Sequence, residues 1–390
     1  MTALRAGRAG FNERDVNGPL WMRLDASIIF LAAGLSAIGL IVVYSATRGV
    51  TGPDDVADTS FLQRQILFIA VGSFLAAVVA AFDYRKARPL VPFIYAGTVL
   101  LLFPLVAGRL GLSFLQAGSN FNGATSWYSL GFVTIQPSEF AKLSLIIALA
   151  AWFSSVQDRE GLQFVNVLVG LGIAGVFAGL VLLQPDFGTV MVYAAVVAGV
   201  VVVAGVAMRH AAVVLAVVGL AIAFMIRAGF LREAQLNRFT AFVDPENQFR
   251  FTVTQSEIAI GNGGIFGKGL FEGTQNNNSL VPEKETDFIF SVLGEEFGFL
   301  GGAVLLVLLG LLLFRIWRVA HLAEDDFGRL ICVGVFSMFL FQAFQSIGMN
   351  MGMMPVTGIP LPLISFGGSS MLTTLIALGL VENVHAHRLR

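Results

Sequence analysis

The hydrophobic pattern of this chain is a series of long apolar blocks separated by short polar segments. Each block approaches the roughly 20 apolar residues that a helix needs to cross a bilayer core. Only Gln184-Pro185-Asp186 separates the fifth block from the sixth, which predicts a tight hairpin turn. We therefore predict an all-α membrane protein with about ten transmembrane helices, over residues 26–46, 64–82, 89–108, 137–154, 164–183, 187–207, 211–229, 287–314, 328–348 and 367–385.

The composition indicates that lipid is the main solvent of the chain. Of its 390 residues, 56% are hydrophobic and only 13% are charged, whereas a soluble domain carries roughly 25% charged residues. The formal net charge of −1 does not point to a polyanionic partner such as nucleic acid. The single cysteine, Cys332, excludes an internal disulfide. The chain is polar up to about Leu24 and its first apolar block can span, so we expect no cleaved signal peptide.

Lys and Arg are spread unevenly over the segments between the predicted spans, and this bias predicts the orientation. With the N-terminus inside, the short outer loops hold only Arg48, Arg64 and Arg109, and the loop 349–366 holds none. The inner segments then hold Arg5, Arg8, Arg14, Arg23, Arg85, Lys86, Arg88, Arg159, Arg209, Arg315, Arg318, Arg329, Arg388 and Arg390. We therefore expect both termini to be cytoplasmic.

The predicted domain organisation follows from this orientation. We expect a cytoplasmic tail over residues 1–24 and a single polytopic membrane domain over residues 25–390. Its large extracytoplasmic loops are about 109–136 and 230–286, and both are rich in Gly, Asn, Ser and Thr. The expected location is the bacterial cytoplasmic membrane, with the functional site on its extracytoplasmic side.

Four polar clusters, far apart in sequence, fall at the outer membrane boundary, and the first opens the fourth span. Its Glu139 and Lys142 are three residues apart, so they share a helix face and can pair. A charge within a span costs on the order of 2.5–3.5 kcal/mol on insertion scales, which an internal pair reduces. The pair is either a structural salt bridge or part of a polar cavity that orders substrate groups.

The second and third clusters each place an acid at the start of a span. Asp186 can cap the sixth span, line a site, or do both. Thr286 or Asp287 can cap the eighth span, but a partly desolvated Asp287 would also have a pKa raised toward the range of a general base. Glu295 and Glu296 follow within the apolar run, so they should face protein or water rather than lipid.

The fourth cluster, residues 355–370, has three prolines, no charge and two candidate hydroxyls, Ser365 and Ser369. Irregular backbone near a bilayer is tolerated where it is buried or lines a cavity. This segment is therefore either a wall of the site or a re-entrant connection without chemistry. No His/Cys cluster has metal-ligand spacing, so we assign no protein metal site. The absence of a Walker motif argues against an ATP-driven pump.

Together these clusters resemble the SEDS family (shape, elongation, division and sporulation). The resemblance runs from the first span to Arg390 and is strongest in the segments IQPSEFAKL, LQPDFGT, Gln255-Ser256 through GKGLFEGTQ, VPEKETDFIFSVLGEEFGFLG and PVTGIPLPLISFGGSS. It implies a membrane glycosyltransferase fold of the GT-C-like type. It also implies polymerisation of lipid II, the undecaprenyl-pyrophosphate disaccharide-pentapeptide, with a class B penicillin-binding protein as partner. The motif Gly273-Thr274-Gln275 and the short N-terminal tail favour the elongation branch over the division branch.

The resemblance assigns roles to individual residues. The essential acid of the family's TDFIF motif maps to Asp287, the PSExxK pair to Glu139 and Lys142, and the QPDxGT acid to Asp186. The candidate substrate contacts also include Gln275, Ser365 and Ser369.

The chain departs from the family pattern at two positions. Ser126 stands where members usually have a basic residue, and Glu285 where many have His. If the missing basic residue contacts donor phosphates, another cation must replace it, and the candidates are Arg64, Arg109, Arg238 and Lys268.

The expected reaction needs one base and a source of positive charge. Lipid II is α-linked to pyrophosphate and the product is β-linked, so a single inversion suffices. Asp287 would accept the proton of the attacking hydroxyl, an effect worth about 10²–10⁴-fold. Positive charge on the leaving pyrophosphate would come from Arg or Lys, or from Mg²⁺ or Mn²⁺ shared with the substrate. The alternatives are a lipid II flippase or another lipid transporter, which needs a polar path across the membrane, and a non-catalytic scaffold for the penicillin-binding protein.

Overall fold

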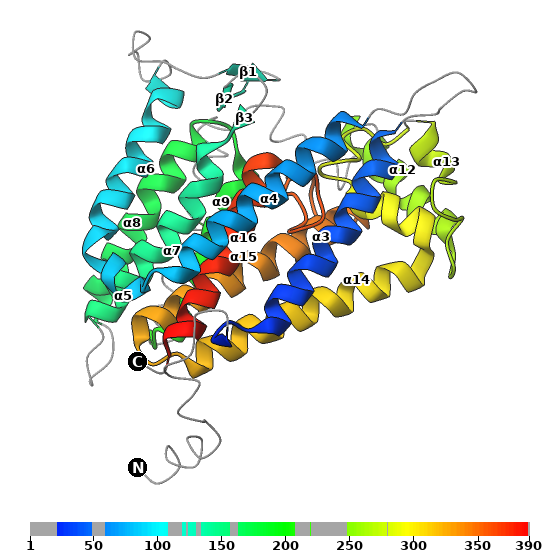
Figure 1. The fold of residues 1–390 in the computed structure, drawn as a ribbon. Helices are drawn as coiled ribbons and strands as arrows, with labels where there is room; N and C mark the ends of the chain where they lie inside the picture. The colour runs from blue at the N-terminus through cyan, green and yellow to red at the C-terminus, as the bar shows by residue number, and fades with distance from the viewer. Residues whose placement is uncertain are drawn as a thin grey trace.

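The structure is a computed structural model that describes residues 22–48, 59–107, 119–121, 124–129, 134–156, 163–206, 219, 248–278 and 280–388. It is a bundle of long helices with three short strands at one end (Figure 1). The helices are α3 (Ala26–Thr47), α4 (Ser60–Ala81), α5 (Tyr84–Ala87), the 3-10 helix η2 (Arg88–Leu90), α6 (Val91–Val106), α7 (Pro137–Val156), α8 (Phe164–Leu182), α9 (Phe187–Val203), α12 (Gln248–Gly263), α13 (Thr274–Asn277), α14 (Ile289–Leu322), α15 (Asp326–Asn350) and α16 (Gly368–His387).

Nine of the ten predicted spans coincide with helices of the described residues, and the tenth, 211–229, lies outside them except for residue 219. In the described part, seven helical segments are long and apolar enough to cross a membrane. The helix α9 is shorter, with 17 residues. Buried polar side chains such as Thr373, Thr374 and Asn383 make α16 less apolar than its neighbours. The chain is therefore a multi-pass helical membrane protein, as predicted.

Two details differ from the sequence prediction. The helix α14 continues to Leu322, well past the predicted end at residue 314, and it kinks at Gly298, which has φ +64°. A side chain there would meet the main-chain nitrogen of Gly267 at 2.3 Å, so the kink lets two backbones touch. In the predicted loop 109–136, the strands β1 (Ser119–Phe121), β2 (Ala124–Ser129) and β3 (Thr134–Ile135) pair antiparallel in that order.

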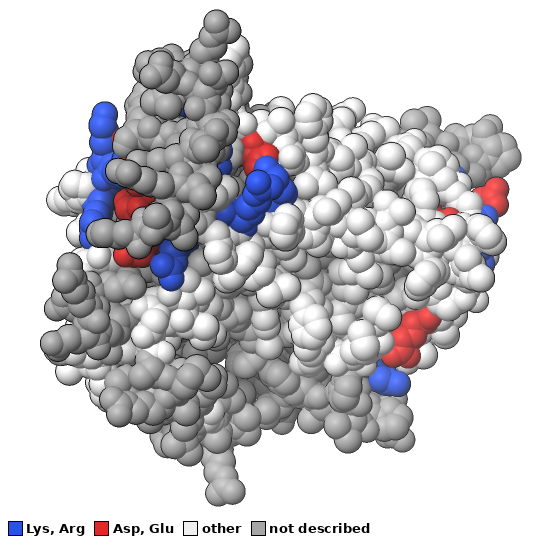
Figure 2. All heavy atoms as spheres, turned by 90° about the horizontal axis from the view of Figure 1, so that it is seen from below, with Lys and Arg blue, Asp and Glu red and all other residues white. Residues whose placement is uncertain are grey.

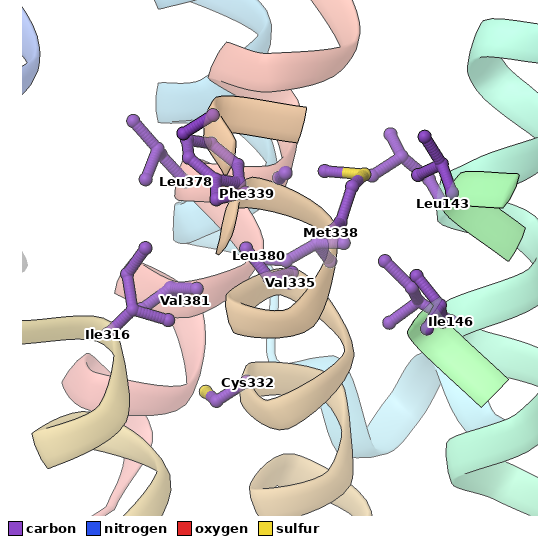
Figure 3. Close-up of a cluster of buried hydrophobic side chains, with 14 of the residues drawn as sticks. Leu143, Ile146, Ile316, Cys332, Val335, Met338, Phe339, Leu378, Leu380 and Val381 are labelled. Atoms are coloured by element: carbon purple, nitrogen blue, oxygen red, sulfur yellow. The ribbon is translucent and has the colours of Figure 1, made fainter. Parts of the chain in front are cut away.

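The core of the bundle is built around α7 and α15. In their most apolar stretches, 61% of α7 and 72% of α15 is buried, against 22% of α4. Figure 3 shows Leu143 and Ile146 of α7 facing Met338 of α15. Because α7 and α15 are enclosed by protein, polar groups on them are shielded from lipid and can line a common interior site.

The two ends of the bundle differ in charge. The main-chain N–H of Asp25, which precedes α3, donates a 2.8 Å hydrogen bond to Glu382 near the end of α16. The start of α3 and the end of α16 therefore lie at the same end of the bundle. This end, defined here as the arginine-rich end, carries Arg23, Arg85, Lys86, Arg88, Arg315, Arg318, Arg329 and Arg388. Figure 2, a view from below Figure 1, shows groups of Lys and Arg on a largely uncharged surface. The cytoplasmic orientation of this end stays a prediction.

Candidate active site

The four polar clusters meet around one cavity at the end of the bundle opposite the arginine-rich end. Its volume is about 430 Å³. It is lined by Ser126, Trp127, Thr134, Gln136, Glu139, Lys142, Gln184, Pro185, Asp186, Phe187, Thr189, Val192, Glu283, Thr286, Asp287, Thr357, Gly358, Ile359, Pro360, Phe366, Gly367, Gly368, Ser369 and Ser370. The first turns of α7, α9 and α16 and the segment before α14 therefore converge, as their common predicted depth suggested.

The ion pair of the first cluster is buried in the wall of this cavity. Lys142 Nζ lies 2.6 Å from Glu139 Oε1, and the side chains are 1% and 5% exposed. Pro137 begins α7, where the missing N–H costs nothing, and the i, i+3 spacing then places both charges on one face. Removing either side chain should lower the stability of the fold strongly, because the other charge would remain buried without a partner.

Asp186 combines the two roles that the sequence left open. Its Oδ1 accepts the N–H of Thr189 at 3.0 Å, which caps α9. Its Oδ2 accepts hydrogen bonds from Gln136 Nε2 at 3.0 Å, Ser138 Oγ at 3.2 Å and Thr189 Oγ1 at 2.7 Å. Asp186 thus ties the first turn of α7 to the first turn of α9 while lining the cavity.

Asp287 is not the helix cap that one reading of the sequence predicted. The N-cap of α14 is Phe288, and it makes no side-chain capping bond, so that alternative is wrong for both Thr286 and Asp287. Glu283, with φ +51°, opens a turn in which its carbonyl accepts the N–H of Asp287 at 3.0 Å. The Asp287 side chain is half-buried and lines the cavity. This placement suits a carboxylate that works at the boundary of water and lipid.

The fourth cluster provides one wall of the cavity, but its two serines differ in position. Ser369 lines the cavity, and its Oγ accepts the N–H of Gln136 at 2.9 Å. Ser365 is not among the lining residues; its Oγ accepts the N–H of Leu361 at 2.9 Å, and its carbonyl accepts Gln65 Nε2 at 3.1 Å. Ser365 therefore stabilises the turn behind the wall rather than facing the cavity.

The charge of the cavity is strongly one-sided. Its described lining holds the carboxylates Glu139, Asp186, Glu283 and Asp287, and Lys142 is the one cation among them. Ser126, where the resemblance leads us to expect a basic residue, lies in this lining and donates to the carbonyl of Gln184 at 3.0 Å. Among the described lining residues there is therefore no cation besides the paired Lys142 to stabilise a pyrophosphate.

Of the four proposed replacement cations, the two that the structure describes do not line the cavity. Arg64 is exposed in the first turns of α4, and Lys268 lies 3.3 Å from Glu295 in a separate cluster. Arg109 and Arg238 lie outside the described residues.

A separate polar cluster, built around Glu295 and Glu296, fixes the segment that leads to Asp287. Glu295 and Glu296 are buried, as predicted, with exposures of 0% and 1%. Glu295 accepts the main-chain N–H of Gln275 at 2.9 Å and of Asn276 at 3.2 Å. Gln275 is thus held by its backbone here, away from the cavity lining.

Lys284 extends the cluster around Glu295 and Glu296 toward the cavity. It donates to the carbonyl of Asn276, and burial lowers its pKa from 10.5, although Glu285, Glu296 and Glu295 oppose that shift. The cluster therefore connects α13 with the segment 283–287, which lines the cavity.

Several positioning residues were not among the site residues predicted from the sequence, although Gln136, Ser138 and Thr189 lie within the motifs IQPSEFAKL and LQPDFGT. Gln136, Ser138 and Thr189 bind Asp186, and Asn350, at the end of α15, binds the main chain of Asp287. A polar amide within an apolar run was the available signal for Asn350, because such a group needs a partner in the interior.

Comparison with known proteins agrees with the fold and the motifs. Residues 25–390 match the FtsW/RodA/SpoVE family, described as cell cycle proteins. The probable peptidoglycan glycosyltransferase FtsW of Trichlorobacter lovleyi is 33% identical over 366 residues, covering 93% of this chain and 93% of that protein.

Solved structures give the same result. A chain of a peptidoglycan synthase complex that coordinates polymerization and crosslinking aligns with a TM-score of 0.75 and 32% identity, over 94% of this chain and 98% of that one. The rod shape determining protein RodA of Thermus thermophilus aligns with a TM-score of 0.70 and 31% identity, over 95% and 100% of the two chains. The SEDS resemblance is confirmed, and the chain belongs to the FtsW/RodA/SpoVE family, which includes peptidoglycan glycosyltransferases.

Proposed function

We propose that this protein is a peptidoglycan glycosyltransferase that polymerises lipid II into glycan strands with inversion at the anomeric carbon. The observation that carries the proposal is the convergence of Glu139, Lys142, Asp186 and Asp287 on one cavity of about 430 Å³. The family relationship gives the reaction class. The bias of arginines to the opposite end supports an extracytoplasmic cavity in the cytoplasmic membrane.

Asp287 is the base in this proposal. Its half-buried carboxylate takes the proton from the acceptor sugar hydroxyl as that oxygen attacks the anomeric carbon of the donor. The bond to pyrophosphate breaks in the same step, so no covalent intermediate is needed. The Glu139–Lys142 pair and Asp186 hold the first turns of α7 and α9 and so set the shape of the cavity. The sugars would react there while the prenyl chains remain in lipid.

The leaving pyrophosphate needs positive charge that the described lining supplies poorly. The four carboxylates of the lining would attract a divalent cation, and they would repel a pyrophosphate that has no cation bound to it. Within the described residues, however, no group of three or more His, Cys, Asp and Glu side chains could hold a metal by itself. We therefore propose that Mg²⁺ or Mn²⁺ would be shared with the substrate phosphates, and that Glu283, the exposed carboxylate of the described lining, would hold it. The ion would neutralise charge on the leaving group. Chelation should stop polymerisation, and either ion should restore it.

We further propose a crosslinking partner of the class B penicillin-binding type and a role in cell elongation. The partner is supported by the similarity to a chain of a synthase complex that coordinates polymerization and crosslinking. The motif Gly273-Thr274-Gln275 supports elongation, although the identities to FtsW and RodA, 33% and 31%, are close. Depletion of the protein should give rounded cells; filamentous cells would instead assign it to division.

Lipid II polymerisation by the purified protein, with and without its crosslinking partner, tests the proposal. Wild type should form glycan strands, and Asp287→Ala should form none while still binding the partner. Glu272→Gln, which changes an exposed acid outside the cavity, is the matched control and should remain active. Equal product from Asp287→Ala would remove Asp287 as the base. No product from wild type with partner and cation present would favour a lipid II transporter, tested by flipping in vesicles, or a scaffold.

A further inference from the structure

We propose that the arginine-rich end binds an anionic glycerophospholipid, with one acyl chain in a groove between α3, α4 and α16. The groove has a volume of about 440 Å³ and lies apart from the polar cavity. Its lining on α3 runs from Ile28 to Leu40, about 18 Å at 1.5 Å per residue, and Leu24 extends it beyond the start of the helix. That length suits an extended acyl chain rather than a compact ligand.

The groove exists because small residues line α3 and α4 where they diverge. Ala33 and Ala37 of α3 face Ser73 and Ala77 of α4 across it. On the other side α4 is held tightly against α16, since a side chain at Gly379 would meet the carbonyl of Ala76 at 2.6 Å. The helices α4 and α16 therefore pack closely against each other, whereas α3 lies across the groove from them. The space between α3 and this pair is open to lipid.

A buried, incompletely bonded carboxylate closes the arginine-rich end of the groove. Glu382 is 6% exposed and lines the groove. Its Oε2 accepts the N–H of Asp25 at 2.8 Å, but its Oε1 is buried and has no hydrogen-bond partner among the described residues. A buried acceptor is costly to leave unsatisfied. A hydroxyl of a lipid headgroup such as glycerol would satisfy it.

The mouth of the groove carries excess positive charge. Arg23 directly precedes Leu24 of the groove, and Arg388 lies within electrostatic range of Asp25, Arg315 and Arg318. Arg315 pairs with Asp25, whereas Arg318 is exposed and forms no ion pair with the residues that the structure describes.

The local charge balance favours an anion. Among the described residues, the mouth holds four arginines, Arg23, Arg315, Arg318 and Arg388, against the two carboxylates of Asp25 and Glu382, which is an excess of two positive charges in this part of the chain. Basic pockets between transmembrane helices on the cytoplasmic side bind anionic headgroups. An apolar groove that ends in this mouth therefore matches a phospholipid whose phosphate meets the arginines and whose chain enters the groove.

Native mass spectrometry of the detergent-purified full-length protein tests this site, using an equimolar mixture of phosphatidylglycerol, phosphatidylethanolamine and phosphatidylcholine. Wild type should retain phosphatidylglycerol in preference to the two zwitterionic lipids. Arg318→Gln should weaken that retention about fivefold, the effect expected of one surface cation. Ala77→Phe, which fills the groove from an exposed position, should reduce retention further.

Matched controls separate the site from general effects of charge and bulk. Lys86→Gln removes an exposed cation at the same end, and Ala96→Phe adds bulk to an exposed face of α6; neither should alter retention. Equal retention of all three lipids by wild type, or unchanged retention in both groove variants, would overturn the proposal. Thermal unfolding verifies that each variant is folded. A second mixture replaces phosphatidylcholine by phosphatidic acid, which is anionic but has no headgroup hydroxyl beyond its phosphate. Retention of phosphatidic acid equal to that of phosphatidylglycerol would overturn the assignment of Glu382 as the acceptor for a headgroup hydroxyl.

Discussion

The side-chain amide of Asn350 donates a 2.9 Å hydrogen bond to the main-chain carbonyl of Asp287, joining the end of α15 to the segment before α14. The same side chain accepts the N–H of Ser291 at 3.0 Å. Asn350 is fully buried, so these bonds are protected from water. One asparagine therefore fixes both the residue assigned as the base and the first turn of the helix behind it.

Replacing Asn350 by Ala should lower both stability and activity. The Asp287 carbonyl and the Ser291 N–H would lose a buried partner, which costs about 1–3 kcal/mol for each unsatisfied group. Thermal unfolding and lipid II polymerisation measure the two effects. Asn278→Ala, at an exposed asparagine, is the control and should change neither. Full activity of Asn350→Ala would show that Asp287 does not depend on this support.

The Glu139–Lys142 pair can be separated into structural and functional parts. Glu139→Gln or Lys142→Met alone leaves a buried charge without its partner, so each should destabilise the protein by about 3–5 kcal/mol. The double variant removes both charges and should recover most of that loss in thermal unfolding. If the pair serves the substrate, the stable double variant will remain inactive. An active double variant would reduce the pair to a structural salt bridge.

Asp186 offers a similar separation of capping from charge. Asp186→Ala removes the cap of α9 and should cost about 0.5–2 kcal/mol of stability, whereas Asn is itself a good N-cap. Asp186→Asn should therefore be nearly as stable as wild type but less active if the negative charge orders the cavity. Polymerisation and thermal unfolding are compared with Asp325→Asn, a cap of α15 at the other end. Wild-type activity of Asp186→Asn would limit Asp186 to capping.

Gly188 tests how closely the walls of the cavity must approach. A side chain there would lie 2.5 Å from the carbonyl of Thr357, so Gly188→Ala must push α9 away from the 355–370 segment. Activity should fall more than stability. Gly179→Ala in α8 meets nothing within 4 Å, and it should be neutral or stabilising by about 0.5–1 kcal/mol. Equal activity of the two variants would indicate that this wall tolerates displacement.

The depth of each functional group in the membrane could be predicted from the sequence. The thickness of the bilayer requires long apolar runs, and their lengths located nine spans that coincide with described helices. Counting along these spans placed Glu139, Asp186 and Asp287 at one level, and all three line one cavity. The family motifs pointed to the same residues, since they occur where polar segments enter the bundle.

Position around the bundle depended on how the helices pack, which the sequence does not specify. The sequence also predicts Ser365, Lys268 and Gln275 at this level, yet none of them is in the described lining of the cavity. Their partners are Leu361 and Glu295, contacts formed by turns and helix ends. Hydrophobic periodicity determines how deep a residue lies and which residues share a helix face. Close packing decides which neighbouring helix each face contacts. At Gly379, for example, the missing side chain lets α16 pack directly against Ala76 of α4, and a groove remains between these helices and α3.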